Sequence, residues 1–221
     1  MPRRLAIVGP FQAKVLEYQD PPLQPHQVLV RTKWASGKHG TTVAMFDGGA
    51  YHGQRFDQEM RLFVEAEKEA SSEWKPGKSG TSGVGTIIEV GPEVKHWKPG
   101  DRVFGLMDIR ETNICPEDML WELGDIDPTL ALCIEPAYVA FHCVRESQVR
   151  YGDSVAVIGL GALGLLTVRI AAQAGAEAIF AVDPLPNRRE WAVRNGADRA
   201  FDPRDGDVAL EIHRLTGGKG V

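Results

Sequence analysis

The chain has 221 residues, of which 43% are hydrophobic and 25% charged, and its formal net charge is −5. This composition is typical of a globular protein that buries a sizeable core in one large or two modest domains. The negative charge gives no reason to expect nucleic acid as a partner. The three cysteines form no Cys-x-x-Cys pair, so neither a disulfide framework nor a thiolate zinc knot is indicated, and we expect a cytoplasmic location.

No membrane-directed segment is predicted. The apolar run at the N-terminus stops at Pro10 and is too short for the core of a signal peptide. Residues 154–168 are apolar enough to suggest a membrane span, but they contain three glycines and are followed by Arg169 and Gln173. A strand, a turn and a helix explain them better, so we expect no membrane partner.

The first part of the chain is predicted to be rich in strands. Short β-rich runs separated by Pro and Gly occupy residues 4–8, 13–18, 27–34, 84–91 and 101–105. Together they predict a small, mostly antiparallel barrel over residues 1–127. Residues 56–74 are highly charged with few apolar anchors, and we interpret them as a helical excursion on the surface.

The second part, residues 128–221, alternates between strands and helices. Residues 130–144 predict a buried connecting helix. Strands are then expected at 154–158, at 178–182 and near Ala200, and helices at 162–174, 187–195 and 207–215. Such alternation predicts parallel strands with right-handed crossovers. The whole chain is therefore expected to be of the α/β class, with a β-rich N-terminal domain.

A glycine motif separates the first of these parallel strands from its helix. Gly159, Gly161 and Gly164 have the spacing G-x-G-x-x-G. The first glycine permits a tight turn, the second lets the backbone approach a pyrophosphate, and the third lets the helix pack closely on the strand. Free N–H groups at the helix start, together with the macrodipole, favour phosphate there. The predicted site for the adenosine half of a dinucleotide comprises Gly159, Leu160, Gly161, Ala162, Leu163 and Gly164.

The residues around the motif support this Rossmann-type interpretation. Leu163, Leu166 and Ile170 follow at helical spacing as the expected buried stripe, and Gly175 offers a C-terminal cap. Taken alone, the motif is also compatible with an ordinary glycine-rich turn of an α/β protein. Here the apolar strand before it, the helix after it and an acidic residue at the end of the next strand all match.

That acidic residue is Asp183, 19 positions after Gly164. A carboxylate there accepts hydrogen bonds from both ribose hydroxyls and repels a 2′-phosphate, so NAD is favoured over NADP. Arg188 and Arg189 complicate this prediction. A guanidinium five residues further on could pair with a 2′-phosphate, lie against the adenosine or face water.

Segments along nearly the whole chain resemble the medium-chain dehydrogenase/reductase superfamily. They are residues 34–42, 80–91 and 98–103, the pair Glu135-Pro136, and the stretch from Gly159 to Asp183. The resemblance implies a GroES-like barrel followed by a Rossmann domain. It also implies hydride transfer between NAD(H) and a small-molecule alcohol or carbonyl substrate, with alcohols, polyols and sugar-like carbonyls all left open.

The chain departs from the zinc-dependent members of this superfamily. Those members bind the catalytic metal through a Cys in the early loop and the His-Glu of the signature, where this chain has His39, Thr81 and Ser82. Hydroxyls are poor zinc ligands, and His39 with Glu135 alone would be a weak site. We therefore assign no metal ligands and expect no catalytic zinc.

Without zinc, another group must handle the proton that accompanies hydride transfer. In an extended loop, alternation would put His39 and Thr41 on one side, and Thr41 matches the position of a proton-relay hydroxyl in zinc-containing relatives. We hypothesise that the Thr41 hydroxyl contacts the substrate oxygen while His39 exchanges the proton. The alternative is that His39 is an ordinary solvated or backbone-bonded residue.

The strand count predicts only half of a Rossmann domain. The family domain has six strands in the order 3-2-1-4-5-6, and residues 154–221 supply three of them. Residues 155–158 would then form an exposed, apolar sheet edge. We expect the chain to be a fragment of a longer enzyme, or a homo-oligomer or another partner to cover this edge. The alternative is a non-catalytic nucleotide-binding or interaction protein derived from such a dehydrogenase.

Overall fold

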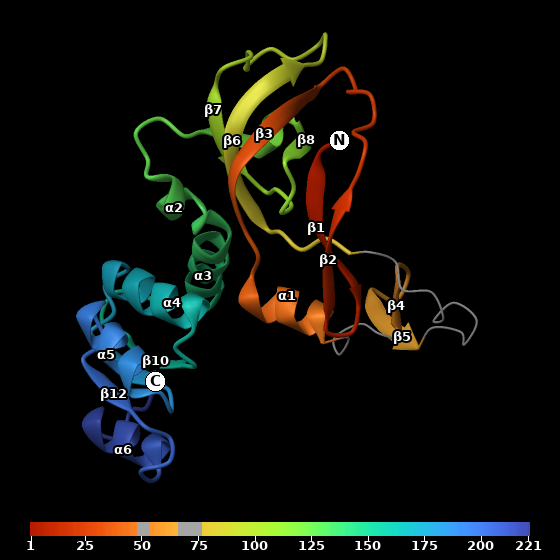
Figure 1. Cartoon of the computed structure of the whole chain (residues 1–221). Helices are drawn as coiled ribbons and strands as arrows, with labels where there is room; N and C mark the ends of the chain where they lie inside the picture. Colours follow the sequence, from red (N-terminus) through yellow and green to blue (C-terminus); the bar gives the residue numbers. More distant parts are fainter. Residues whose placement is uncertain (48–53, 66–76) are drawn as a thin grey trace. The chain divides into compact units, whose positions relative to one another are not determined.

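The computed structural model of the chain describes residues 1–47, 54–65 and 77–221 (Figure 1). These residues divide into two compact units, Met1–Ile134 and Glu135–Val221, and each unit is considered by itself. Across the described ranges, no helix combines the length and the apolar character needed to cross a membrane.

The first unit is built around a five-stranded antiparallel sheet with the order β8-β3-β6-β7-β9 (Figure 1). Its strands are β3 (Gln27–Ser36), β6 (Ser82–Val90), β7 (Arg102–Gly105), β8 (Thr112–Pro116) and β9 (Leu120–Glu122), with a 3₁₀ turn, η1 (Glu117–Met119), before β9. Val28, Val30, Ile87 and Val103 are almost completely buried in its core. Because side chains alternate across a strand, Val28 and Val30 lie on the same face and fill one layer.

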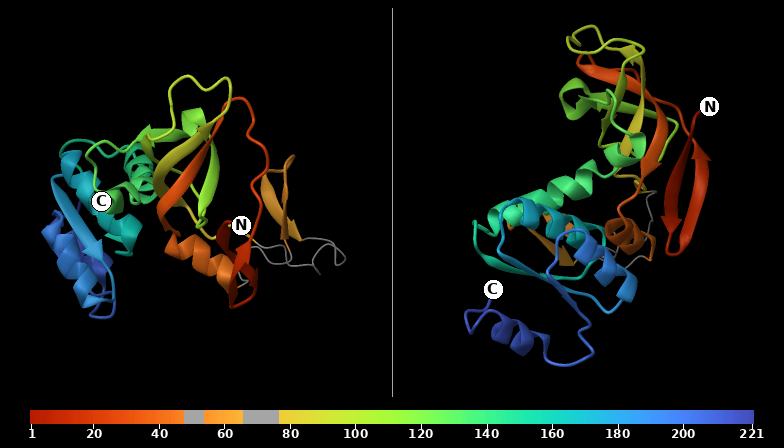
Figure 2. Two further views of the ribbon diagram at one scale, coloured as in Figure 1. Left: turned by 45° about the horizontal axis from the view of Figure 1, so that its top comes forward. Right: turned by 90° about the vertical axis from the view of Figure 1, so that its left-hand side faces the viewer.

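A separate antiparallel hairpin completes the β-structure at the N-terminus. It consists of β1 (Arg3–Gly9) and β2 (Gln12–Glu17), the two red strands of Figure 2. A bridge between Arg4 and Arg110 links the hairpin to the segment before β8. The prediction of a mostly antiparallel first part is confirmed. The prediction missed β8 and β9, because β9 has three residues and β8 contains Asn113 and Pro116, residue types that are depleted in strands.

The prediction of a helix over residues 56–74 is wrong in its described part, and residues 66–74 lie outside the described residues. β4 (Gln54–Asp57) and β5 (Leu62–Glu65) form an antiparallel hairpin with Phe56 opposite Phe63. One carboxylate oxygen of Asp57 accepts hydrogen bonds from the backbone N–H groups of Glu59 and Met60. This side-chain turn, with edge-on contact between the two Phe rings, outweighs the helical propensity of the charged residues.

The predicted connecting helix over residues 130–144 is divided into two. α2 (Pro128–Ala131) begins at a cap in which Asp127 accepts the Thr129 N–H, and α3 (Ile134–Glu146) follows after a short break. Pro136 explains the break, because a proline ring clashes with the carbonyl four residues earlier in a continuous helix. The expectation that this helix is buried is also wrong for much of it. Ala140 and Val144 of α3 are buried, whereas Tyr138 and Phe141 are exposed.

The second unit contains a parallel three-stranded sheet with the order β10-β11-β12. Its strands are β10 (Ser154–Ile158), β11 (Ala178–Val182) and β12 (Arg199–Phe201), and its remaining helices are α4 (Ala162–Gln173), α5 (Pro186–Arg194) and α6 (Val208–Leu215). β10 pairs with β11 from Ser154 opposite Ala178 to Ile158 opposite Val182. The predicted alternation of parallel strands and helices is confirmed, with bounds shifted by at most a residue or two.

The packed face of α4 differs from the predicted stripe. Val168 and Ala171 are the fully buried positions, and Leu165 packs on the same core. Ile170 also packs on this core, as expected, while Leu163 and Leu166 are only partly buried. Gly175 has φ +91 just after the C-cap residue Ala174, in agreement with its predicted role as a cap.

Candidate functional site

The glycine motif forms a tight turn between β10 and α4. Gly159 has φ +87, a conformation that side chains other than glycine rarely adopt, and its N–H donates to the carbonyl of Val182 at 2.8 Å. A Cβ atom on Gly164 would lie 1.9 Å from the carbonyl oxygen of Gly159. The close approach of helix to loop therefore requires glycine at position 164. Leu160, fully buried, fixes the turn in the core of the second unit.

The start of α4 leaves backbone donors at this turn. Gly161 is the N-cap residue, with extended backbone and no side-chain cap hydrogen bond, and Ala162 and Leu163 open the helix. The N–H groups of a first helical turn have no partner within the helix. Together with the macrodipole they make the turn suited to an anion such as a pyrophosphate.

Asp183 lies next to this turn and takes part in it directly. Its side chain is 3% exposed. One carboxylate oxygen accepts the Leu160 N–H at 2.8 Å, and the other accepts the Leu185 N–H at 2.8 Å. Asp183 therefore ties the glycine turn to the end of β11, a role that the sequence did not predict.

The contacts of Asp183 limit how it can meet a ribose. The Arg188 guanidinium lies 3.4 Å from the carboxylate oxygen that also accepts the Leu160 N–H. A carboxylate has about four acceptor positions, and three are engaged here. One position is open while Arg188 stays in place, and a second opens if the long contact to Arg188 is given up. Acceptance from both ribose hydroxyls thus requires Arg188 to move.

Hydrogen bonding keeps Asp183 ionised. Burial acts to raise the pKa of this carboxyl, but the N–H groups of Leu185 and Leu160 and the Arg188 guanidinium outweigh burial, and the pKa is lowered below its ordinary value. The group is therefore an anion at neutral pH, the form that accepts hydrogen bonds most strongly.

A second carboxylate, Asp202, follows β12 and was missed from the sequence. Its side chain is 7% exposed and forms ion pairs with Arg189 at 3.0 Å and Arg204 at 2.6 Å. Hydrogen bonds from Arg204 are the main cause that lowers the pKa of Asp202. Its position in the sequence could have revealed it. Asp202 directly follows β12, as Asp183 directly follows the neighbouring parallel strand β11.

The hypothesis for His39 and Thr41 needs correction in its geometry. Both residues belong to α1 (His39–Phe46) and not to an extended loop. Positions two apart in a helix differ by about 200° around its axis, so alternation does not place them on one side. Thr41 is exposed, and the side chain of His39 lies outside the described part of the chain.

Residues 36–42, around the start of α1, contact residues 79–81, which lead into β6, within the first unit. The Lys38 N–H donates to the Thr81 hydroxyl at 3.2 Å, and the Thr81 N–H donates to the Ser36 carbonyl at 2.8 Å. The Thr42 hydroxyl donates to the Ser79 carbonyl at 3.4 Å. The start of α1 is thus fixed against the residues that lead into β6.

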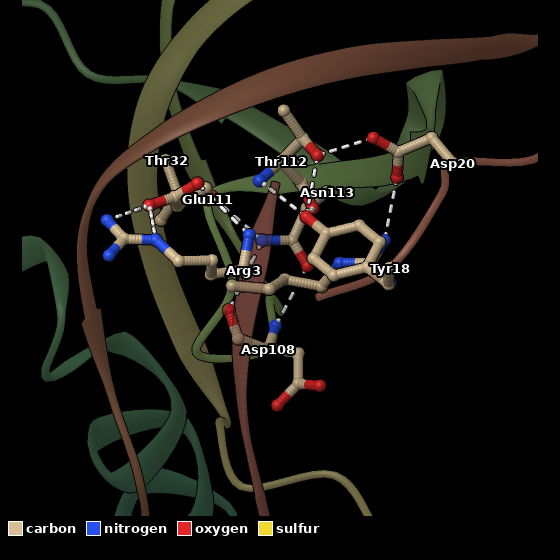
Figure 3. A network of polar contacts seen from close by, with 9 residues as sticks. Arg3, Tyr18, Asp20, Thr32, Asp108, Glu111, Thr112 and Asn113 are labelled. Carbon is tan, nitrogen blue, oxygen red and sulfur yellow. Dashed lines mark hydrogen bonds and ion pairs between the residues drawn. The ribbon is translucent and has the colours of Figure 1, made fainter. Parts of the chain in front are cut away.

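Asp108 supports this junction and was also missed from the sequence. It is buried, and one of its carboxylate oxygens accepts the N–H groups of Ser79, Gly80 and Ile109 at 2.7–2.9 Å. Figure 3 shows Asp108 at the edge of a wider polar network in the first unit. A Cβ on Gly80 would lie 2.3 Å from the Ile109 nitrogen, so this segment is closely packed.

The residues at the signature positions do not fit a zinc ion. Thr81 and Ser82 offer hydroxyls, and the Thr81 hydroxyl is already an acceptor for Lys38. The Ser82 hydroxyl is buried and has no hydrogen-bond partner among the described residues. Burial raises the pKa of the Cys115 thiol to about 11, which makes it a poor source of thiolate.

Comparison with known proteins covers both units. A family model described as "Alcohol dehydrogenase GroES-like domain" matches residues 24–120, and one described as "Zinc-binding dehydrogenase" matches residues 162–221. D-guloside 3-dehydrogenase of Escherichia coli (strain K12) is 33% identical over 99% of this chain and 65% of its own length. (R,R)-butanediol dehydrogenase of Bacillus subtilis (strain 168) is 27% identical over 93% of this chain and 64% of its own.

The fold agrees with these matches. The crystal structure of 2R,3R-butanediol dehydrogenase from Bacillus subtilis superposes with a TM-score of 0.79 at 26% identity, over 98% of this chain and 68% of that one. The chain belongs to the medium-chain dehydrogenase/reductase superfamily. The predicted α/β class, with a GroES-like first part and a partial Rossmann-type sheet, is confirmed. The chain spans about 65% of the length of the curated relatives that it matches.

Proposed function

We propose that the chain is, or forms part of, an oxidoreductase that transfers a hydride between NAD(H) and an alcohol or carbonyl substrate. The observation that carries this proposal is the turn at Gly159–Gly164, where helix and loop approach so closely that a Cβ at position 164 is excluded. The ionised carboxylate of Asp183 beside this turn favours NAD over NADP, because it would repel a 2′-phosphate. The names of the curated relatives point to a secondary alcohol of a sugar or a diol as the substrate class.

In this proposal the residues of the chain bind, orient and handle a proton. Backbone N–H groups at Gly161, Ala162 and Leu163 hold the pyrophosphate, and Asp183 accepts a ribose hydroxyl. When bound, the nicotinamide supplies the hydride acceptor. As the substrate C–H bond gives up its hydride, the O–H proton passes to the protein, and a carbonyl is formed. His39 and Thr41 are the proposed proton-handling residues, and we propose that no catalytic zinc takes part.

Binding and turnover of the whole chain test this function. NADH fluorescence should increase on addition of the chain, and Asp183→Ala should weaken binding by about tenfold or more, since a charge-assisted hydrogen bond is lost and the turn loses its support. Oxidation of a panel of sugar alcohols and diols with NAD⁺ should be strongly reduced by His39→Ala at neutral pH. Thr41→Val should reduce it as well.

Three results would contradict parts of the proposal. Absence of NADH binding by the wild-type chain would reject the cofactor, and unchanged rates for His39→Ala would remove His39 from proton handling. Stoichiometric zinc in metal analysis would reject the zinc-independent mechanism. Binding of NADH without turnover of any substrate would favour the alternative, a non-catalytic nucleotide-binding protein.

A further inference from the structure

Charged side chains gather where β11 and β12 end, and they form one network. The members are Asp183, Arg188, Arg189, Asp202 and Arg204. Of these, the sequence analysis considered only Asp183, Arg188 and Arg189 in connection with the ribose. Asp202 and Arg204 come from the segment after the next strand, so the network joins two neighbouring strand ends.

Arg189 is held at both strand ends at once. One of its terminal nitrogens donates to the backbone carbonyl of Asp183 at 2.7 Å and to the Asp202 carboxylate at 3.0 Å. Its side chain is 21% exposed. The guanidinium is therefore largely enclosed, with its charge balanced by Asp202.

Arg204 pairs with the same carboxylate and shares one of its oxygens with Arg189. Its side chain donates to both oxygens of Asp202, at 2.8 and 2.6 Å, and to the Pro184 carbonyl at 2.7 Å. Such two-point pairing is geometrically specific and strong. Unlike Arg189, the Arg204 side chain is 68% exposed, so solvent screens its charge more.

The network bears on the choice between NAD and NADP. Arg189 lies beside Asp183, bonded to its backbone carbonyl, and its guanidinium would attract a 2′-phosphate only if it were not already paired. We propose that Asp202 is a positioning residue that sets dinucleotide preference by acting through Arg189. With Asp202 in place, Arg189 is paired and Asp183 meets the ribose; without it, Arg189 is available to a 2′-phosphate. This inference rests on the proposed function and adds a determinant outside the glycine motif.

The test measures discrimination against a 2′-phosphate with ligands that contain only the adenosine half. Calorimetric titration of the full chain with AMP and with adenosine 2′,5′-bisphosphate gives a ratio of Kd values. The wild-type ratio should favour AMP. Asp202→Asn should shift the ratio toward the bisphosphate by about tenfold, the effect of roughly one charge-assisted hydrogen bond. Asp202→Glu should retain most of the wild-type preference.

Two further variants identify the arginine that acts. Arg189→Met in the Asp202→Asn background should abolish the gain in bisphosphate affinity, whereas Arg204→Met in the same background should leave it. Arg204→Met alone is the matched control, because it removes the other partner of Asp202 and leaves the Arg189 contact in place. Its Kd ratio should equal that of the wild type.

The outcomes separate the two proposals. If the wild-type chain binds neither AMP nor NADH, the proposed function fails. If it binds AMP but Asp202→Asn weakens both ligands equally, the ratio is unchanged, Asp202 has a purely structural role and the inference is overturned. A gain that survives Arg189→Met also overturns it.

Discussion

Among the glycines that the structure describes, Gly164 is the one at which a Cβ would come closest to another atom. Its role follows from the carbonyl of Gly159, which occupies the place of a Cβ. Gly164→Ala must push α4 away from the turn, so we expect a loss of about 1–3 kcal/mol in the free energy of unfolding and loss of NADH binding. Urea unfolding and NADH fluorescence measure the two effects.

Gly40→Ala is the matched control for this substitution. Gly40 lies in α1, and a Cβ there would meet no atom within 4 Å. Alanine in a helix is favoured over glycine by about 0.5–1 kcal/mol, so this variant should be as stable as the wild type or slightly more stable. Equal stability of both variants would show that the packing at Gly164 does not depend on glycine.

The sequence predicted the glycine residues of the motif and Asp183, because each is defined by its spacing from neighbours in the chain. It did not predict what Asp108 or Asp202 does. The carboxylate of Asp108 binds backbone N–H groups at Ser79 and Gly80, far away in the sequence, and such contacts have no periodicity that a pattern can reveal. The sequence therefore predicted residues that are defined by local spacing, but not carboxylates that bind backbone N–H groups of distant segments.

At the scale of elements, the polar network of Figure 3 joins the segment after β2 to the start of β8. The Tyr18 hydroxyl accepts the Thr112 N–H at 2.9 Å and donates to the Thr112 carbonyl at 3.0 Å. Arg110 lies over the Tyr18 ring at 4.0 Å and pairs with Asp20 at 2.7 Å. Aromatic, ionic and backbone contacts thus all join the segment after β2 to the start of β8.

Tyr18→Phe tests how much this connection stabilises the first unit. The substitution leaves the Thr112 N–H without its acceptor, which should lower the free energy of unfolding by about 1–2 kcal/mol. Tyr151→Phe is the control, because Tyr151 is 91% exposed. Urea unfolding of both variants checks this, and equal midpoints would mean that solvent replaces the lost hydrogen bond.

The elements themselves differed in how well the sequence predicted them. β10, α4 and β11 were predicted to within a residue, because two apolar strands of five residues and the glycine motif between them fix their positions. Residues 39–46 form a helix where a loop was predicted. Residues 56–65, the described part of the helix predicted over 56–74, belong to a hairpin. In the hairpin the decisive contacts are the Asp57 turn and the Phe56–Phe63 pair, which composition alone does not reveal.

At the scale of the whole molecule, β10 pairs with β11 on one side and with no other strand among the described residues. Ile158 at its end is 83% exposed, and an open hollow of about 1080 Å³ borders the strand. An unpaired apolar strand edge readily accepts another strand. We propose that a second copy covers this edge in solutions of the chain.

Light scattering after size exclusion tests this assembly. The wild-type chain should have a mass above that of a monomer and rising with concentration, and Ile158→Lys should shift it toward the monomer, because an edge charge opposes strand pairing. Leu210→Lys, at an exposed position of α6, is the control and should leave the mass unchanged. A monomeric wild-type chain at high concentration would reject the proposal.

The hydrogen bond from Leu160 to Asp183 has a consequence for attempts to redesign the dinucleotide preference. Replacing the acidic residue with a small neutral one would remove the repulsion of a 2′-phosphate. Here that residue also accepts the Leu160 N–H of the glycine turn, so we expect such a replacement to weaken the proposed binding of the pyrophosphate, which both dinucleotides share. Asp202 makes no contact with Leu160, so a substitution there that releases Arg189 is the starting point we propose for changing the dinucleotide preference.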